Sequence, residues 1–297
     1  MLNSKWYCPT CGNRWFLLVK KSRDFFVKNG HSPEFSIYHC SACNIAYSWP
    51  SLSLDELADY YPDDFEAFVP PKRLRAFLNR QIYRSDLKRI EKYLNRKTSS
   101  LFEIGAGRGE FLFEASSRGW EVAGIEPGHL GVRYAKEFYG IDLECAFIEE
   151  WSFDHTHDVI VMRHTLEHVS EADKVLRTIF EKALPDRGLL YLKLPRGDSW
   201  EARFFKKYWH GYDLPRHRIH FTSSGIKKLL IRIGFSRVLI QPDVVSLDMI
   251  RSAEYAVMRR HLPKMDMALM PLAQPIALMM SPFGPGRMIV IAEKGGA

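Results

Sequence analysis

The chain has 297 residues, of which 46% are hydrophobic and 26% are charged, and its formal net charge is +7. This composition excludes an intrinsically disordered protein. The length suits one α/β domain together with a smaller module. No charged-then-apolar leader opens the sequence, which disfavours export and predicts a cytoplasmic protein.

Two C-x-x-C pairs, Cys8-Pro-Thr-Cys11 and Cys40-Ser-Ala-Cys43, stand near the N-terminus. Tetrahedral zinc accepts four thiolates, and each tight turn presents two of them to one ion. The pattern predicts a structural zinc module over residues 1–50, because four sulfurs leave no open position for catalysis. We expect metal removal to unfold only about these fifty residues. Four unrelated buried cysteines, or a redox pair, are the alternatives.

An acidic, proline-bearing stretch over residues 51–71 predicts a linker with at most one short helix. From Lys72 to Lys97 apolar residues recur at helical spacings, which predicts an amphipathic helix with a basic outer face. Such a face could meet phosphate, nucleic acid or anionic lipid, but it is also what an ordinary solvated helix shows.

Short apolar runs then alternate with helical patterns, which predicts a parallel sheet covered by helices on both faces. The fold class is therefore α/β, a Rossmann-like domain over residues 72–297 behind a small zinc-ribbon-like module. We expect helices over residues 110–118 and 132–139. The expected strands are Ser100–Ile104, Glu121–Ile125, His157–Met162, Gly188–Leu194, Arg237–Gln241 and Met288–Ala292.

The apolar segment near residues 265–283 is interrupted by Asp266, Gln274 and two internal prolines. These interruptions disfavour a membrane-spanning helix. The segment could instead lie on the inner face of a membrane or cover an apolar groove.

A glycine-rich turn, Glu103-Ile-Gly105-Ala-Gly107-Arg-Gly109, follows the first strand of the domain and opens a helix. Glycine permits the tight turn and a close approach of backbone to a ligand. Glu126 closes the next strand, where a carboxylate can bind the hydroxyls of a ribose. The G-x-G-x-G spacing and the charge of Glu103 disfavour a pyrophosphate and favour a cationic ligand. A purely structural turn is the alternative.

Together these motifs resemble the class I S-adenosylmethionine-dependent methyltransferases. Residues 158–169 resemble the fourth-strand motif of the ubiquinone-type branch (methyltransferase type 23-like), and residues 194–198 resemble the end of its fifth strand. Residues 212–221 resemble a stretch of bacterial members that carry a zinc module and act on sugars or lipid-linked intermediates of cell-surface polysaccharide biosynthesis.

The resemblance implies cofactor contacts that run from the methionine end of S-adenosylmethionine to its adenine. Several alignments of the adenine stretch over residues 146–149 are open. The implied contacts are Glu103, Gly105, Gly107, Gly109, Glu126, Pro127, Phe147, Ile148 and Arg163.

Methyl transfer from a sulfonium is a direct displacement, and alignment alone can lower its barrier by about 7–11 kcal/mol. A base that deprotonates the acceptor is therefore helpful but not essential. Histidine titrates near neutrality, so His164 is the first candidate base and His168 the second, with His217 beside them. If residues 165–169 are helical, His164 and His168 share one face. A structural role for His168 is the alternative.

Residues 196–222 crowd aromatic, histidine and cationic side chains into the place where an acceptor lid would lie. Arginine pairs with phosphate and aromatic rings stack on sugars, so Arg196, Tyr212 and Arg216 are candidate acceptor contacts. A structural loop that packs on the core is the alternative.

We therefore expect a methyltransferase that acts, at oxygen, on a small-molecule, sugar or lipid-linked glycan acceptor. An RNA methyltransferase that binds RNA through the zinc module is a second hypothesis. Nucleic acid is disfavoured because no aromatic stacking platform accompanies the N-terminal basic residues. A nicotinamide-dependent oxidoreductase and a non-catalytic scaffold are further alternatives.

Overall fold

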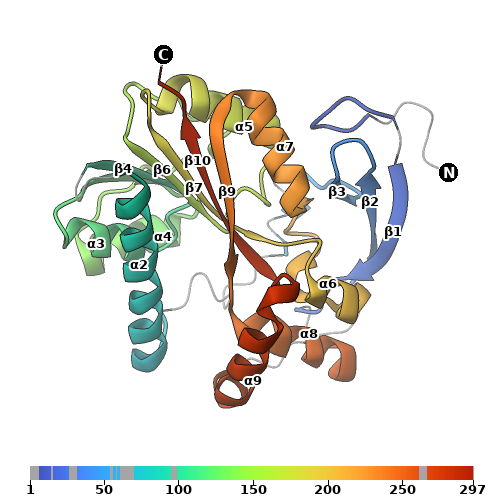
Figure 1. The fold of residues 1–297 in the computed structure, drawn as a ribbon. Coiled ribbons are helices and arrows are strands. Elements are labelled where there is room, and N and C mark those ends of the chain that lie inside the picture. The colour runs from blue at the N-terminus through green and yellow to red at the C-terminus, as the bar shows by residue number, and fades with distance from the viewer. Residues whose placement is uncertain are drawn as a thin grey trace.

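The computed structural model describes residues 7–14, 16–26, 32–53, 56–57, 59–60, 70–94, 99–260 and 266–296. Figure 1 shows a large central sheet with helices on both faces and a small N-terminal sheet beside it. The predicted α/β class, a sheet covered on both sides behind a small N-terminal module, is confirmed.

Six described strands form the large sheet in the order β5-β4-β6-β7-β10-β9. Strands β5, β4, β6 and β7 are parallel, and β10 runs antiparallel to both of its neighbours. All six predicted strands are present, and only the direction of the last departs from a purely parallel sheet. They are β4 (Ser100–Ile104), β5 (Glu121–Ile125), β6 (Val159–Arg163), β7 (Leu189–Pro195), β9 (Phe235–Asp243) and β10 (Arg287–Lys294).

Alternate residues of these strands enter two cores, one on each face of the sheet. Leu101 and Val161 pack towards α2 and α3, whereas Phe102 and Met162 pack towards α5 and α7. The apolar strands are therefore buried on both sides, as parallel sheets usually are. The helices are α2 (Arg73–Leu94), α3 (Glu110–Ser116), α4 (His129–Tyr134), α5 (Ala172–Thr178), α6 (Trp200–Phe205), α7 (Ser223–Ile233), α8 (Ser246–Met258) and α9 (Asp266–Met280).

Short π and 3-10 turns extend several of these helices. The helix predicted over residues 132–139 is α4 continued by a π turn. These turns are η1 (Ala135–Tyr139), η2 (Ile179–Ala183), η3 (Lys206–Tyr208), η4 (His210–Tyr212) and η5 (Ser281–Phe283).

The N-terminal sheet has the order β1-β2-β3-β8, with β1 (Phe16–Arg23), β2 (Glu34–Cys40), β3 (Ile45–Trp49) and β8 (Ile219–Phe221). Strand β8 comes from the segment that the sequence suggested as an acceptor lid, and it pairs antiparallel with β3. The segment over residues 196–222 thus completes the sheet of the N-terminal module. A free lid is not what the structure shows.

The described part of the linker contains one short helical stretch, residues 56–57. Ser53 and Glu56 cap each other there: Ser53 N–H donates to Glu56 Oε2, and Glu56 N–H donates to Ser53 Oγ. Residues 54–55, 58 and 61–69 of the linker lie outside the described residues.

The apolar segment near residues 265–283 forms α9, which contains Pro271 and Pro275. It packs on α8 and lies at the far end of the molecule from the chain's C-terminus (Figure 1). Among the described residues, no helix combines the length and apolar character needed to cross a bilayer.

Candidate functional site

The glycine-rich turn between β4 and α3 lies at the carboxyl end of the parallel strands. Gly105, Gly107 and Gly109 have φ angles of +73°, +56° and +73°, a left-handed conformation that favours glycine. A Cβ atom at Gly105 would lie 2.5 Å from Thr165 Oγ1, whereas one at Gly107 would meet nothing within 4 Å. The turn therefore packs against the loop after β6 at one glycine and leaves open space above the backbone at another.

Glu126 follows β5 and joins that strand to the glycine turn. Its Oε2 accepts a hydrogen bond from Gly107 N–H at 2.8 Å, and its Oε1 accepts one from Gly128 N–H at 2.9 Å. Burial raises the pKa of Glu126, and the two backbone amides oppose that rise. Each carboxylate oxygen keeps further acceptor capacity, so the pair can bind two hydroxyls of a ligand.

Glu103 lies in β4 directly before the turn and is 2% exposed. Its Oε2 has no hydrogen-bond partner among the described residues. Burial raises the pKa of Glu103 to about 8, although the nearby Arg163 guanidinium acts in the opposite direction. A buried carboxyl without a partner is costly, and a cationic ligand would offset that cost.

Arg163 ends β6 on the same face of the sheet as Glu103. Its Cζ lies 4.4 Å from the centroid of the Tyr83 ring and 4.6 Å from that of Phe111. Within the described part of the chain, Nε and Nη1 make no hydrogen bond. The Glu103 carboxyl thus offers an unpartnered acceptor and the Arg163 guanidinium offers unpartnered donors. Such a pair suits the ammonium and the carboxylate of an amino acid.

The two residues that could contact an adenine differ in exposure. Phe147 is 37% exposed, whereas Ile148 is 8% exposed and belongs to the core. Pro127, directly after Glu126, is half-buried. Phe147 and Pro127 can therefore offer a surface to a ring, whereas Ile148 packs in the core.

The turn after β6 carries His164, which has a φ of +56°. Its Nε2 accepts a hydrogen bond from Arg287 Nη1 at 3.2 Å, and its Nδ1 lies 3.4 Å from Glu167 Oε1. Burial and the charge of Arg287 hold the pKa of His164 well below its usual value, so its imidazole is neutral. Both ring nitrogens already have neighbours, which speaks against His164 as the base.

Residues 165–169 form a turn, not a helix, because His168 N–H donates to Thr165 O, three residues back. The expectation that His164 and His168 share a helix face is therefore wrong. Instead His168 meets His217 from the segment before β8, with their ring centroids 4.7 Å apart.

Glu167, His168 and His217 form a cluster in which one carboxylate oxygen and one nitrogen of each ring lie within 4.8 Å of one another. Burial raises the pKa of Glu167 to about 8 and lowers that of His168 to about 3. Burial also lowers the pKa of His217. Both histidines are therefore neutral, and the cluster brings together groups that are far apart in the sequence.

Arg216 is a structural residue, and the expectation that it binds an acceptor is corrected. Its guanidinium is fully buried and pairs with Asp24 at 2.9 and 3.0 Å and with Asp213 at 3.1 and 2.7 Å. Asp24 belongs to the N-terminal part of the chain, directly after β1. Arg216 thus fastens the segment over residues 196–222 to the N-terminal module.

The other two candidate acceptor contacts are also engaged within the protein. Tyr212 is 7% exposed, and its hydroxyl accepts a hydrogen bond from Lys20 Nζ at 2.9 Å. Arg196 Nε donates to Asp198 Oδ1 at 3.2 Å. Burial contradicts direct acceptor contact by Tyr212, whereas Arg196 is only partly buried. Glu167 and Arg287 lie closer to the histidines, and Arg287 is a residue that the sequence analysis did not single out.

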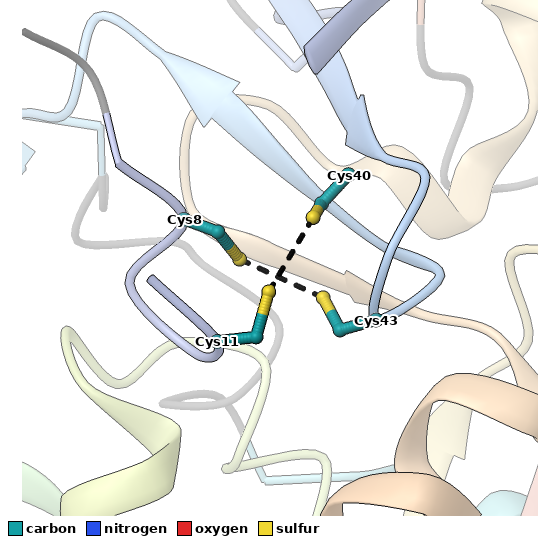
Figure 2. A group of neighbouring side chains, drawn as sticks. All are labelled: Cys8, Cys11, Cys40 and Cys43. Carbon is teal, nitrogen blue, oxygen red and sulfur yellow. Dashed lines mark hydrogen bonds between the residues drawn. The ribbon is translucent and has the colours of Figure 1, made fainter. Parts of the chain in front are cut away.

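The four N-terminal cysteines converge on one point (Figure 2). The Sγ atoms of Cys8 and Cys43 are 3.6 Å apart, as are those of Cys11 and Cys40, and all four cysteines are free. All four sulfurs lie within 4.8 Å of one another. Four thiolates bound to one zinc ion would be about 3.8 Å apart, since Zn–S bonds are about 2.3 Å long. The cluster could therefore hold a tetrahedral metal ion.

Comparison with solved structures finds chains of the same fold. One is a SAM-dependent methyltransferase from Archaeoglobus fulgidus, with 17% identity and a TM-score of 0.51 over 72% of this chain and 94% of that one. Another comes from Thermotoga maritima, with 17% identity and a TM-score of 0.50 over 74% and 93%. The plantazolicin methyltransferase BpumL, solved with SAH, has 18% identity and a TM-score of 0.50 over 82% and 90%. At these identities the likeness shows the fold alone.

No curated protein sequence matches this chain. A family model described as a methyltransferase domain matches residues 74–240, which is more than half of the chain. The matched region contains the glycine turn, Glu126 and the turn after β6. The chain therefore belongs to the methyltransferase-domain family, and it is an S-adenosylmethionine-dependent methyltransferase of class I fold.

Proposed function

We propose that this enzyme transfers the methyl group of S-adenosylmethionine to a hydroxyl oxygen of a sugar, a lipid-linked glycan or a related small molecule. The observation that supports cofactor binding at this site is the pair of carboxylates beside the open glycine turn. Glu103 is buried without a partner, and Glu126 is fixed by two backbone amides. A nucleoside that carries a cationic amino-acid end matches both of them.

Each part of the cofactor then has a residue to hold it. Glu103 would accept the ammonium, and Arg163 would donate to the carboxylate. Glu126 would bind the ribose hydroxyls, and Pro127 and Phe147 would flank the adenine. Gly107 lets the ligand lie against the backbone, because no side chain fills the space above it.

The reaction is a direct displacement at the methyl carbon. The acceptor oxygen forms the new O–CH₃ bond as the S–CH₃ bond breaks, and the electron pair of that bond stays on sulfur. The hydroxyl proton passes to an unprotonated ring nitrogen of His168 or His217. These histidines lie beside Glu167, where the turn after β6 meets the segment before β8. Thr165, in the same turn, contacts Gly105, so the cluster and the cofactor turn share one edge of the sheet.

An apolar surface on α6, α8, α9 and η5 supports a lipid-linked acceptor and a peripheral contact with the inner face of a membrane. Helix α8 connects the two regions: its Asp248 pairs with Arg287, which hydrogen-bonds His164 near the cluster. These elements pack on one another, and exposed apolar side chains gathered on such elements are typical of an interaction site. The most exposed of these side chains are Phe204, Val257, Leu272, Met279 and Phe283.

For the N-terminal cysteines we propose one structural zinc ion bound by Cys8, Cys11, Cys40 and Cys43. The sulfur separations support a tetrahedral site, and four thiolates leave no position for an acceptor. The zinc would stabilise the turn before β1 and the turn between β2 and β3, and hence the sheet that β8 completes.

The acceptor class is tested by incubating cell lipids, glycans and RNA with the enzyme and with S-adenosylmethionine labelled in its methyl group. We expect label in the lipid or glycan fraction, and none with the Glu103→Gln, Glu126→Gln double variant. Glu144→Gln, an exposed carboxylate nearby, is the matched control and should behave as wild type. Label in RNA alone would contradict the proposed acceptor class.

A further inference from the structure

The cluster of Glu167, His168 and His217 has the composition of a metal site. Glu167 and His168 lie on the turn after β6, and His217 lies before β8. His217 Nε2 is 3.9 Å from Glu167 Oε1, and the three ligand atoms all lie within 4.8 Å of one another. Ligands bound at about 2.1 Å to one ion would be about 3.0–3.4 Å apart. Side-chain movements on the order of 1 Å would therefore bring all three onto one cation.

Backbone carbonyls orient both histidines in the way that metal-bound histidines are oriented. His168 Nδ1 lies 2.9 Å from Arg216 O, and His217 Nδ1 lies 2.9 Å from Gly211 O. A carbonyl oxygen can only accept, so we assign the ring proton to Nδ1 and the lone pair to Nε2 in both residues. Histidines that bind metal through one nitrogen commonly donate the other N–H to such a carbonyl.

Glu167 supplies an independent indication of a missing cation. Its carboxylate is 1% exposed, and neither oxygen has a hydrogen-bond partner among the described residues. Arg287, a cation on the neighbouring strand β10, is already paired with both carboxylate oxygens of Asp248 at 2.6 and 2.5 Å. The nearest ring nitrogen, His164 Nδ1, lies 3.4 Å from Oε1 but makes no hydrogen bond with it. A buried carboxylate in that state calls for an ion or another ligand.

The backbone holds the two halves of the cluster together. Glu167 O accepts hydrogen bonds from Arg218 N–H at 2.9 Å and from Ile219 N–H at 3.1 Å. The residues next to His217 are therefore fastened to the turn that carries Glu167 and His168. A site assembled in this way needs no large rearrangement to bind an ion.

We propose that Glu167, His168 and His217 bind a divalent transition-metal ion, with at least one coordination position left for an oxygen of the acceptor. Two imidazoles and one carboxylate suit zinc, iron or manganese better than magnesium or calcium. Three protein ligands leave the site open, in contrast to the four cysteines. This inference rests on the proposed function. It would make the cluster a Lewis acid that lowers the pKa of a bound hydroxyl, so that the proton is lost to a water molecule and no protein base is needed.

The test is a titration of the full chain with Mn²⁺, followed by electron paramagnetic resonance of the free ion. The purified chain is first treated with EDTA until one zinc per chain remains, because Mn²⁺ does not compete for a four-thiolate site. We expect wild type to bind one equivalent of Mn²⁺. Glu167→Gln and His217→Gln should each weaken that binding at least about tenfold. His155→Gln, an exposed histidine outside the cluster, is the matched control and should bind as wild type does.

Calorimetry with S-adenosylhomocysteine on the same samples checks that each variant is folded and separates the two proposals. Wild type that binds S-adenosylhomocysteine but neither Mn²⁺ nor Zn²⁺ at this site overturns the metal site and leaves the methyltransferase proposal standing. Equal Mn²⁺ affinity in wild type and in the folded variants also overturns it. Metal binding without any heat from S-adenosylhomocysteine would overturn the proposed function instead.

Discussion

The glycine-rich turn and the segment over residues 196–222 are held in place in different ways. In the turn, Gly107 N–H bonds to Glu126, 19 residues away, and most partners lie on neighbouring strands. In the segment, Arg216 bonds to Asp24, 192 residues away, and β8 pairs with β3 of the N-terminal sheet. The proposed cofactor site is thus built within the Rossmann-like domain. The segment over residues 196–222, where we propose that the acceptor binds, is held by both that domain and the N-terminal module.

Loss of zinc is expected to have the largest effect. It should destabilise the N-terminal sheet, including β8, and leave the glycine-rich turn intact. Structural zinc sites in small peptides contribute about 10–16 kcal/mol to folding. In a Cys11→Ser variant, we expect hydrogen exchange to accelerate in β1–β3 and to spread to β8 and η4, because these share one sheet and one core. Exchange confined to the first fifty residues, as the sequence suggested, would contradict this. Binding of S-adenosylhomocysteine should survive.

Arg216→Met tests the buried ion pairs that connect the segment over residues 196–222 to the N-terminal module. Breaking a buried ion pair leaves Asp24 and Asp213 without their cation, and such changes cost about 3–5 kcal/mol. We expect the free energy of unfolding, measured by chemical denaturation of the zinc-loaded chain, to fall by that amount. Arg177→Met, which removes the largely solvent-accessible pair with Asp173 (side chains 42% and 20% exposed), is the matched control and should leave the unfolding midpoint unchanged. Equal unfolding midpoints for the two variants would show that the ion pairs of Arg216 contribute no stability.

Glu126→Gln should lower the affinity for the cofactor and leave the segment over residues 196–222 intact. Hydrogen bonds to charged groups contribute about 1.5–3 kcal/mol, so we expect S-adenosylhomocysteine to bind roughly 10- to 100-fold more weakly. In wild type, ligand at 100 times its Kd should add about 2.7 kcal/mol to the free energy of unfolding. Thermal melts with S-adenosylhomocysteine measure both effects, and NADH should give no shift. A shift with NADH would indicate the oxidoreductase alternative.

The smallest expected effect is a pH dependence that comes from Glu103. Its pKa is raised from 4.5 to about 8 in the folded chain, so the native state binds more protons than the unfolded chain between these values. Stability without ligand should therefore fall as pH rises through this window. A cationic ligand binds the ionised form, so S-adenosylmethionine should bind roughly five-fold more tightly at pH 8 than at pH 7. The charged groups that act on Glu103 are Arg163, Glu126, Asp86 and Glu110.

Calorimetry in buffers of different ionisation enthalpy measures the proton that Glu103 releases on binding at pH 7. Glu103→Gln should abolish both the buffer dependence and the pH dependence of the affinity. A wild-type binding enthalpy that is the same in every buffer would show that Glu103 is already ionised in the free enzyme.

The features predicted correctly from the sequence depend on local patterns. The strand that contains Glu103, the turn at Gly107 and the strand before Glu126 follow directly from alternating apolar runs and glycine spacing. The structural role of Arg216 could not be predicted in this way, because only the tertiary fold brings its partner Asp24 near. The same holds for Glu167 and His217, whose proximity depends on the path of residues 196–222. The aromatic, histidine and cationic side chains of residues 196–222 suggested a binding segment. The ion pairs of Arg216 show that part of this segment is structural.

The pairing of β3 with β8 also limits how this enzyme can be divided or recombined. A chain that starts at the Rossmann-like domain would expose the unpaired edge of β8. It would also expose the apolar surfaces of Trp209, Tyr212 and Leu214 that now face Phe35 and Ile37. Open strand edges and bared aromatic rings promote aggregation. The N-terminal module should therefore not behave as an exchangeable cassette, and chimaeras that graft this catalytic domain onto another protein must carry residues 7–49 with it.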